Sequence, residues 1–245
     1  MKKRLSLKRD SREILVDVLI FGFAGLILLM AAVLIWLSTL EIPDLSSFEE
    51  RRVQQSTKIY DRTGEIMLYD LHQDVRRTVV PFDQISPYIK NATVAIEDDQ
   101  FYNHFGIDVK AIIRAAVSNV QEGGLGQGGS TITQQVIKNS VLQREKTFTR
   151  KAKEAILALK LEQLKTKDEI LEIYLNESPY GGTIYGAEEA AQAFFRTSAK
   201  DLTLGEAAYL AALPQAPTYL SPYGNNRDDL DSRQKLVLEK MRENG

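Results

Sequence analysis

The stretch SPYIKNATVAIEDDQF, from Ser86 to Phe101, is where the sequence pattern changes and becomes helical. Ser86 followed by proline is typical of a helix N-cap with proline at the first helical position. Ile89, Ala92 and Ile96 then recur three and four residues apart, which places them on one face of a helix. The stretch predicts an amphipathic helix with one buried face, and it sets the expected fold class as mainly α.

Helical patterns continue from this stretch towards the C-terminus. Thr166 with Glu169, and Thr203 with Glu206, have the spacing of capping boxes, which satisfy backbone donors at a helix start. Pro214 cannot continue the helix that precedes it. Helices are predicted at residues 108–120, 131–139, 149–164, 168–175, 187–195 and 204–213.

The residues before this helical region have a β pattern. Residues 57–71 contain two β-prone runs around a turn marked by Asp61 and Gly64, which predicts a β-hairpin. Residues 75–82 are expected to add a third strand. Further along, residues 122–129 (EGGLGQGG) carry five glycines and predict a mobile or substrate-wrapping loop.

Residues 18–37, VLIFGFAGLILLMAAVLIWL, contain no charged side chain. Twenty helical residues span about 30 Å, the thickness of a bilayer core, and Trp36 near one end suits a membrane interface. A signal peptide has a shorter apolar region and a small-residue cleavage site, and a buried soluble helix is rarely apolar all round. The segment therefore predicts a single transmembrane helix.

The charges on the two sides of this helix predict its orientation. Six basic residues precede it, whereas acidic residues come first after it. The positive-inside rule then makes residues 1–17 a cytoplasmic tail. Residues 38–56 are expected to form a juxtamembrane linker and residues 57–245 an extracytoplasmic domain that starts with the β element. The expected location is the cell (inner) membrane.

Composition narrows the classes of function. The chain has 245 residues, of which 44% are hydrophobic and 26% charged, as is typical of a globular domain with appendages. A net charge of −2 shows no basic excess, so nucleic-acid binding is not expected. The absence of cysteine excludes disulfides, a thiolate nucleophile and a zinc–cysteine site.

Carboxylates and basic side chains remain as candidates for chemistry. The two histidines, His72 and His104, have no recognisable spacing to a serine and an aspartate, and no phosphate-loop motif occurs. Glu97 ends an apolar helix face just before Phe101 and Tyr102, and a partly desolvated carboxylate beside apolar rings suits a general base. The alternative is that Glu97 only faces solvent, since most acids at helix ends are structural.

A second candidate group lies on one predicted helix. Arg150 and Glu154 are four residues apart and share a helical face, with Lys151 beside them and Lys138 upstream. The cations of such a group can bind the oxygens of a pyrophosphate. The alternative, from these residues alone, is a salt bridge on the surface of an amphipathic helix.

Five segments of the chain resemble, in order, the five signature motifs of the peptidoglycan glycosyltransferases. The resemblance covers the chain from about residue 57 to residue 241, and five ordered motifs are far more specific than one short motif. The segments are Ala92 to Gly106 (ATVAIEDDQFYNHFG), Gly128 to Asn139 (GGSTITQQVIKN), Arg150 to Ala155 (RKAKEA), Ile173 to Glu177 (IYLNE) with the glycines and alanines that follow, and Leu202 to Pro217 (LTLGEAAYLAALPQAP).

The resemblance implies a lysozyme-like fold, with a helical globular lobe, a smaller membrane-associated lobe and a cleft between them. It also implies an enzyme that polymerises lipid II into β-1,4-linked glycan strands. The implied reaction is an inverting transfer from a donor linked to undecaprenyl pyrophosphate. Both substrates carry lipid tails, so such an active site works at a bilayer surface. Other proteins of cell-wall synthesis or division are further expected partners.

The resemblance also implies roles for particular residues. Glu97 is implied as the general base for the acceptor hydroxyl, and Glu154 as a second catalytic carboxylate that manages the charge of the departing pyrophosphate. The resemblance is also compatible with a divalent cation, Mg²⁺ or Mn²⁺, bound at Glu154. For His104, a structural hydrogen bond and a substrate contact both stay open. The expected substrate-binding residues are Asp98, Phe101, His104, Ser130, Thr131, Gln134, Gln135, Lys138, Asn139, Arg150 and Lys151.

Two other functions stay open beside polymerisation. A lysozyme-like lytic enzyme also uses a glutamate in a helical cleft, but it has no need of a basic group for pyrophosphate. A non-catalytic scaffold of wall synthesis has no need of Glu97 and Glu154.

Residues 59–65 resemble the N-terminal part of bifunctional penicillin-binding proteins, which continue into a transpeptidase domain. The Lys-Thr-Gly motif of that domain does not occur in this chain. We therefore expect no covalent reaction with penicillin. We also expect a truncated bifunctional protein rather than a complete monofunctional one.

Overall fold

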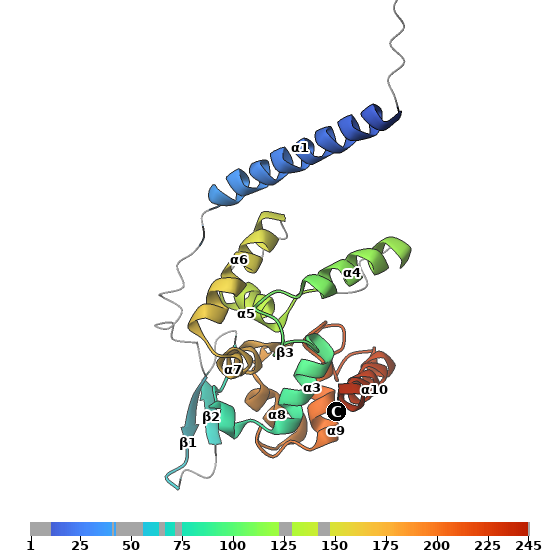
Figure 1. Cartoon of the computed structure of the whole chain (residues 1–245). Coiled ribbons are helices and arrows are strands. Elements are labelled where there is room, and N and C mark those ends of the chain that lie inside the picture. Colours follow the sequence, from blue (N-terminus) through green and yellow to red (C-terminus); the bar gives the residue numbers. More distant parts are fainter. Residues whose placement is uncertain are drawn as a thin grey trace, which may run out of the picture. The chain divides into compact units, whose positions relative to one another are not determined.

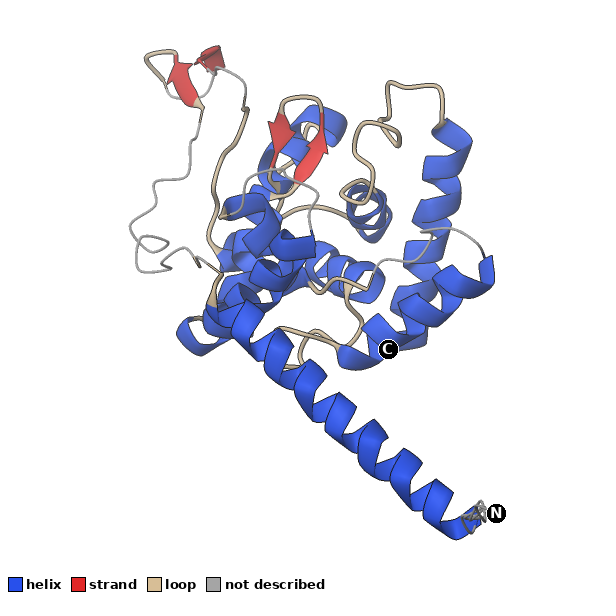
Figure 2. Cartoon of the chain, turned by 90° about the horizontal axis from the view of Figure 1, so that it is seen from above, coloured by secondary structure: helices blue, strands red, loops and turns tan. Residues whose placement is uncertain are grey.

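The computed structural model describes residues 11–40, 42, 56–63, 67–71, 75–122, 129–141 and 148–244. The chain divides into two compact units, residues 1–42 and residues 43–245. The larger unit consists mainly of helices, as Figures 1 and 2 show. The expected mainly α class is confirmed, together with an apolar N-terminal helix and a small β-hairpin.

Helix α1, Ser11–Ser38, contains the apolar segment and begins seven residues before it. Its window Leu19–Trp36 has a mean hydropathy of 2.7, and the large apolar side chains along it are exposed. Within the described residues it is the one helix long and apolar enough to cross a membrane. Residues 1–10 of the predicted tail, and most of the predicted linker, lie outside the described residues.

The predicted hairpin is present at the start of the larger unit. Strands β1 (Thr57–Tyr60) and β2 (Met67–Leu71) pair antiparallel, with an irregularity in register after Ile59. Lys58 of β1 forms an ion pair with Glu189, which is 1% exposed. This buried contact ties the hairpin to the helical part of the unit.

The expected third strand at residues 75–82 is wrong. Only Arg76 makes a bridge, to Ile184, and the segment ends in a 3₁₀ turn, η1, at Phe82–Gln84. Two backbone donors are instead bound by side chains of α7: Val80 N–H by Asn176 at 3.0 Å and Phe82 N–H by Glu172 at 2.8 Å. Pro81 between them has no N–H to offer to a strand.

The helices predicted after residue 86 are all present, with ends shifted by at most two residues. One further helix, α10, was not predicted, because a polar sequence with few apolar residues covers it. The helices are α3 (Pro87–Glu97), α4 (Val109–Glu122), α5 (Ile132–Ser140), α6 (Phe148–Leu164), α7 (Lys167–Glu177), α8 (Ala187–Phe195), α9 (Leu204–Ala212) and α10 (Arg227–Asn244).

Helix starts follow the local signals. The Ser86 side chain accepts from Tyr88 N–H and caps α3, with proline at the first turn. Both predicted capping boxes, at Thr166 and at Thr203, are formed. Thr131 forms a third one with Gln134 at the start of α5. Each box satisfies backbone donors that a helix start leaves unpaired.

A second, unpredicted hairpin leads into α8. Strand β3 (Pro179–Gly181) pairs antiparallel with β4 (Ile184–Tyr185). Gly186 follows with φ +84°, and a Cβ there would lie 2.8 Å from the carbonyl oxygen of Asn176. Only glycine fits this close approach to the end of α7.

The core of the larger unit forms around α9. Residues Ala207 to Ala212 of α9 are all buried, and α3 and α10 pack against this helix. On the other side, α5 packs against α6 and α7, and α4 lies near them in Figure 1. These two groups of helices supply the walls of the cleft described below.

Candidate active site

A cleft of about 540 Å³ opens between the two groups of helices. Its walls come from the end of α3, from α4, from the segment that leads into α5, from α5 and from α10. Residues of the first, second and fifth predicted motifs therefore meet at this cleft, together with residues of α10, the helix that was not predicted. The polar residues lining the cleft are Glu97, Asp98, Asp99, Asp108, Arg114, Ser130, Thr131, Gln135, Lys138, Gln215, Arg233 and Lys240.

Glu97 is the last residue of α3, and its side chain is 10% exposed. Its Oε2 accepts a hydrogen bond from Gln135 Nε2 at 2.7 Å. Its Oε1 is buried and has no hydrogen-bond partner among the described residues, and an Arg233 nitrogen lies 3.6 Å away. One oxygen of this carboxylate is thus held in place while the other keeps its capacity to accept a proton.

Two tyrosines lie close enough to Glu97 to respond to its charge. Tyr174 and Tyr180 are buried, and burial raises the pKa of each phenol above its ordinary value. The Glu97 carboxylate adds to both increases, because a second negative charge nearby is unfavourable. Both phenols are therefore neutral at physiological pH and put no negative charge beside Glu97.

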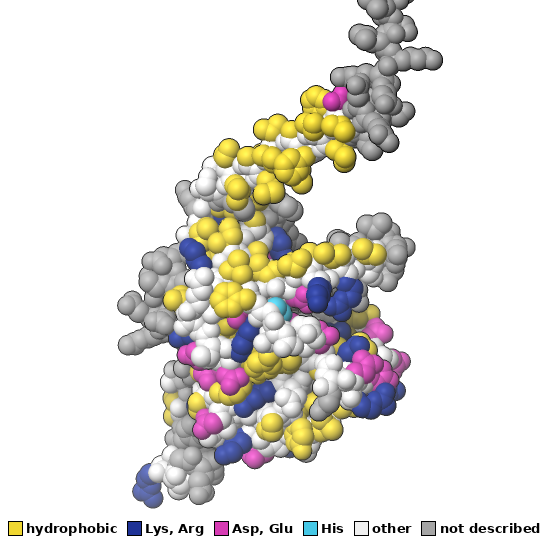
Figure 3. All heavy atoms as spheres, viewed as in Figure 1, with side chains coloured by type: hydrophobic (Ala, Val, Ile, Leu, Met, Phe, Trp, Pro, Cys, Tyr) yellow, Lys and Arg dark blue, Asp and Glu magenta, His cyan; other side chains and the backbone are white. Residues whose placement is uncertain are grey.

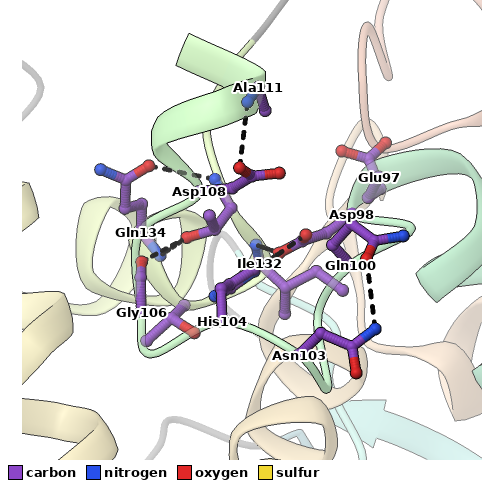
Figure 4. A network of polar contacts seen from close by, with 12 residues as sticks. Glu97, Asp98, Gln100, Asn103, His104, Gly106, Asp108, Ala111, Ile132 and Gln134 are labelled. Carbon is purple, nitrogen blue, oxygen red and sulfur yellow. Dashed lines mark hydrogen bonds and ion pairs between the residues drawn. The ribbon is translucent and has the colours of Figure 1, made fainter.

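Asp98 points away from Glu97 into a separate network, shown in Figure 4. It accepts from Ile132 N–H at 3.0 Å, and His104 Nε2 lies 3.0 Å from each of its oxygens. Figure 4 shows Glu97 lying apart from this network. For His104 the structure therefore provides the structural partner, and Asp98 joins the first motif to the start of α5.

Thr131 and Gln134 also have structural partners. They form the capping box of α5, and Thr131 Oγ1 donates to the carbonyl of Gly106 at 2.7 Å. Gly106 has φ +79°, and a Cβ there would lie 2.9 Å from the carbonyl oxygen of Ala158. These contacts hold the first and second motifs together and against α6, and they give both side chains a structural role.

Phe101 lies in the core and is fully buried. Its ring packs edge-on against Tyr102, with 5.1 Å between centroids, and the Lys167 ammonium lies 4.5 Å from its centroid. This is the placement of a packing residue, and we leave Phe101 out of the proposed substrate site.

Glu154 on α6 is 1% exposed and pairs with two cations. Arg150 Nε lies 3.1 Å from one of its oxygens, and Lys151 Nζ lies 2.9 Å from the other. Lys151 also donates to Ser130 Oγ at 2.6 Å, and Ser130 lines the cleft. The predicted shared face of Arg150 and Glu154 is thus present, and Ser130 connects this cluster to the cleft.

Lys138 on α5 is an exposed residue whose ammonium lies among the charges of both groups. Desolvation lowers its pKa from 10.5, and the cations Lys151 and Arg150 lower it further, while Glu154 and Glu97 oppose the change. Asn139 beside it is exposed as well. Lys138 is therefore the residue that couples the Glu97 end of the site electrostatically to the Glu154 end.

The described residues do not fit the expected divalent cation at Glu154. Both oxygens of this carboxylate already face cations, and no group of three or more His, Asp or Glu side chains among the described residues could hold a metal ion. The prediction stays untested, and no step below involves a metal.

Arg233 is a site residue that sequence reasoning missed. It lies on α10, the unpredicted helix, and lines the cleft opposite Glu97. The signal that could have found it is the spacing of Leu230 and Val237, which are both buried and seven residues apart. Arg233 lies between them on the same helical face.

Comparisons with known proteins identify relatives of this chain. Penicillin-binding protein 1A of Neisseria meningitidis serogroup B (strain MC58) is 41% identical over 225 residues, which are 92% of this chain and 28% of that protein. Penicillin-binding protein 1A of Aquifex aeolicus (strain VF5) is 42% identical over 230 residues, 93% of this chain and 31% of that protein. The chain thus spans less than a third of these relatives.

A solved structure, penicillin-binding protein 1A from Haemophilus influenzae, aligns with a TM-score of 0.41 and 22% identity over 78% of this chain and 18% of that chain. The family model of the transglycosylases matches residues 64–242, which contain all five motifs and every predicted site residue. This chain therefore belongs to the transglycosylase family, the peptidoglycan glycosyltransferases that its motifs resemble.

Proposed function

We propose that this domain polymerises lipid II into β-1,4-linked glycan strands, with Glu97 as the general base. The observation that carries the proposal is the unequal state of the two Glu97 oxygens inside the cleft. Gln135 orients the carboxylate through Oε2, while Oε1 makes no hydrogen bond and lies 3.6 Å from a nitrogen of Arg233, so the carboxylate retains capacity to accept a proton. An alcohol that attacks a sugar carbon must lose its proton, and a carboxylate in reach can take it.

The step is a displacement at the anomeric carbon of the donor. The acceptor hydroxyl oxygen forms the new bond to that carbon while the Glu97 carboxylate takes the hydroxyl proton. The bond from the anomeric carbon to the pyrophosphate oxygen breaks, and undecaprenyl pyrophosphate leaves with the electron pair. Attack from the face opposite the leaving group inverts the configuration.

The leaving pyrophosphate needs positive charge nearby. Lys138 lines the cleft, and Lys151 reaches its wall through Ser130. Arg150 completes a group of three cations, while the buried Glu154 balances only part of their charge. Such a group stabilises negative charge on phosphate oxygens as it develops.

Apolar surface near the cleft supports work on lipid-linked substrates. Helix α4 exposes Val109, Ile112, Ile113 and Val117, and Figure 3 shows this band of apolar side chains along the helix. Exposed apolar stripes of this kind favour contact with a membrane or a partner. With α1 as a transmembrane anchor and a cytoplasmic N-terminus, the domain would act at the outer surface of the membrane.

We propose further that the described part of this chain does not react covalently with penicillin. One Ser-x-x-Lys spacing occurs in α10, from Ser232 to Lys235, and both side chains are exposed. Neither residue lines the cleft. A serine nucleophile needs a positioned base and a substrate pocket, and this pair has no Lys-Thr-Gly partner motif in the chain.

One experiment distinguishes the three functions considered above: polymerisation of lipid II, lysis of peptidoglycan and a non-catalytic scaffold. The full chain in detergent micelles is incubated with lipid II and, in parallel, with finished peptidoglycan. We expect glycan polymer from lipid II and no soluble fragments from peptidoglycan. Release of fragments would identify a lytic enzyme, and inactivity on both substrates would favour a scaffold.

A further inference from the structure

Arg233 is turned into the site by the packing of α10. Leu230 and Val237, three residues before and four residues after it, are fully buried. Residues with this spacing share one face of a helix. Since α10 packs against α3 and α9, that face directs Arg233 towards Glu97 at the end of α3.

Two contacts hold the guanidinium. Its Nε donates to the carbonyl of Ala212 at 3.0 Å, at the end of α9, and a terminal nitrogen lies 3.6 Å from Glu97 Oε1. The Arg233 side chain is 16% exposed. Desolvation lowers its pKa from 12.5 and Glu97 opposes this change, so the guanidinium remains a cation at physiological pH.

We propose that Arg233 is the positioning residue of Glu97: its positive charge favours the charged form of the carboxylate inside the cleft, and its contact with Oε1 fixes how that carboxylate lies. This inference rests on the function proposed above. At 3.6 Å the pair attracts without a direct hydrogen bond, so Oε1 retains a lone pair for the incoming proton.

The anchor on α9 matters once the proton has moved. When Glu97 accepts the hydroxyl proton it becomes neutral and no longer balances the guanidinium. Arg233 still donates to the carbonyl of Ala212, at a helix C-terminus that carries partial negative charge. The cation is therefore not left without a partner in either state of Glu97.

The other groups that face Glu97 cannot replace Arg233. Tyr174 of α7 and Tyr180 of β3 are neutral. Lys138 of α5 favours the charged carboxylate, but it is itself desolvated and is shared with Glu154. Gln135 of α5 carries no charge.

The test replaces Arg233 by methionine and by lysine and follows lipid II polymerisation against pH. In Arg233→Met we expect the acid limb of the kcat/KM profile to move up by about one pH unit, so that kcat/KM falls on the order of tenfold at pH values on that limb and much less above it. Activity should recover at higher pH. Arg233→Lys keeps the charge and should retain a limb close to that of the wild type.

A matched control is Arg227→Met, on the same helix. Arg227 is 57% exposed, pairs with Asp231 and does not line the cleft. We expect its pH profile to match that of the wild type. Lower activity of Arg233→Met with an unmoved acid limb, or a limb that moves equally in Arg233→Lys, would overturn the proposal.

A second readout does not depend on turnover. The glutamate carboxyl carbons of the full chain are labelled with ¹³C, and the Glu97 signal is assigned by its absence in Glu97→Gln. In Arg233→Met this signal should titrate at higher pH than in the wild type. An unchanged titration would refute the role of Arg233. A wild type that fails to polymerise lipid II would instead count against the proposed function, and the titration would still decide on Arg233.

Discussion

Glu97 and Glu154 are two acids of one site with little exposure to solvent, but their oxygens have different partners. Glu154 has a cation at about 3 Å from each oxygen, Arg150 on one side and Lys151 on the other. Glu97 has one oxygen bound to a neutral amide and the other 3.6 Å from Arg233. Each carboxylate has one buried oxygen without a hydrogen bond, but the nearest cation lies 3.1 Å from that oxygen in Glu154 and 3.6 Å from it in Glu97.

This difference assigns separate tasks to residues that the motifs name together as catalytic. A carboxylate held by two cations is a poor proton acceptor and a good anchor for those cations. Under the proposed function, Glu154 positions Arg150 and Lys151 for the pyrophosphate. Under the proposed function, Glu97 is the acid suited to take a proton, because one of its oxygens is bound by a neutral amide and the other lies farther from a cation.

The largest expected effect is that of Glu97→Gln. The amide keeps the shape but cannot accept a proton, so polymerisation of lipid II should fall by about 10²–10⁴-fold. The free energy of unfolding should change little, because no tight ion pair is lost. Near-normal turnover in this variant would show that Glu97 is not the general base, and the proposed difference in task between Glu97 and Glu154 would no longer hold.

Glu154→Gln should mainly affect stability. Breaking a fully buried ion pair costs about 3–5 kcal/mol, and we expect about 2–3 kcal/mol here because Arg150 and Lys151 stay partly exposed. Denaturant unfolding of this variant beside Glu97→Gln measures the contrast directly. Equal unfolding free energies in the two variants would contradict the anchor role.

Lys138→Ala should weaken binding of a lipid pyrophosphate by about 1.5–3 kcal/mol, because one charge-assisted contact is lost. Lys160 on α6 is exposed and does not line the cleft, so Lys160→Ala is the matched control. Calorimetric titration of each variant gives the comparison. A weakening shared by both variants would indicate general electrostatics rather than a specific contact.

The same binding should depend on pH through Lys138. Its pKa lies below the ordinary 10.5, so with rising pH it loses its proton earlier than a free lysine does, and affinity then falls. Lys138→Arg stays charged throughout this range and should remove the decrease. A decrease that persists in Lys138→Arg would have to come from another group.

The smallest expected effect is that of Thr131→Ala. Loss of the α5 cap should cost about 0.5–2 kcal/mol of stability. The KM for lipid II of the folded fraction should stay unchanged, since Thr131 donates to Gly106. A specific rise in KM would return Thr131 to the substrate-binding residues that the motifs imply.

Local patterns were sufficient for most of the helices and for one element of the site. Caps and apolar spacing act over a few residues, and the ends of the predicted helices lie within two residues of those observed. The pairing of Arg150 with Glu154 follows in the same way from a separation of four residues on one helix. Helix α10 was missed because it has few apolar residues, although Asn226 before it and the acids Asp228 and Asp229 in its first turn are helix-start signals.

The sequence by itself determined the helical class and the apolar N-terminal helix, and it singled out two acids as candidates, because short-range patterns and ordered motifs carry that information. Only the tertiary structure decided which partner each acid has. Glu97 meets Gln135 from 38 residues away and Arg233 from another helix, while Asp98, its direct neighbour, turns to the start of α5. Such contacts depend on which helices pack together, and that packing is set by the complementary fit of whole surfaces rather than by spacing along the chain.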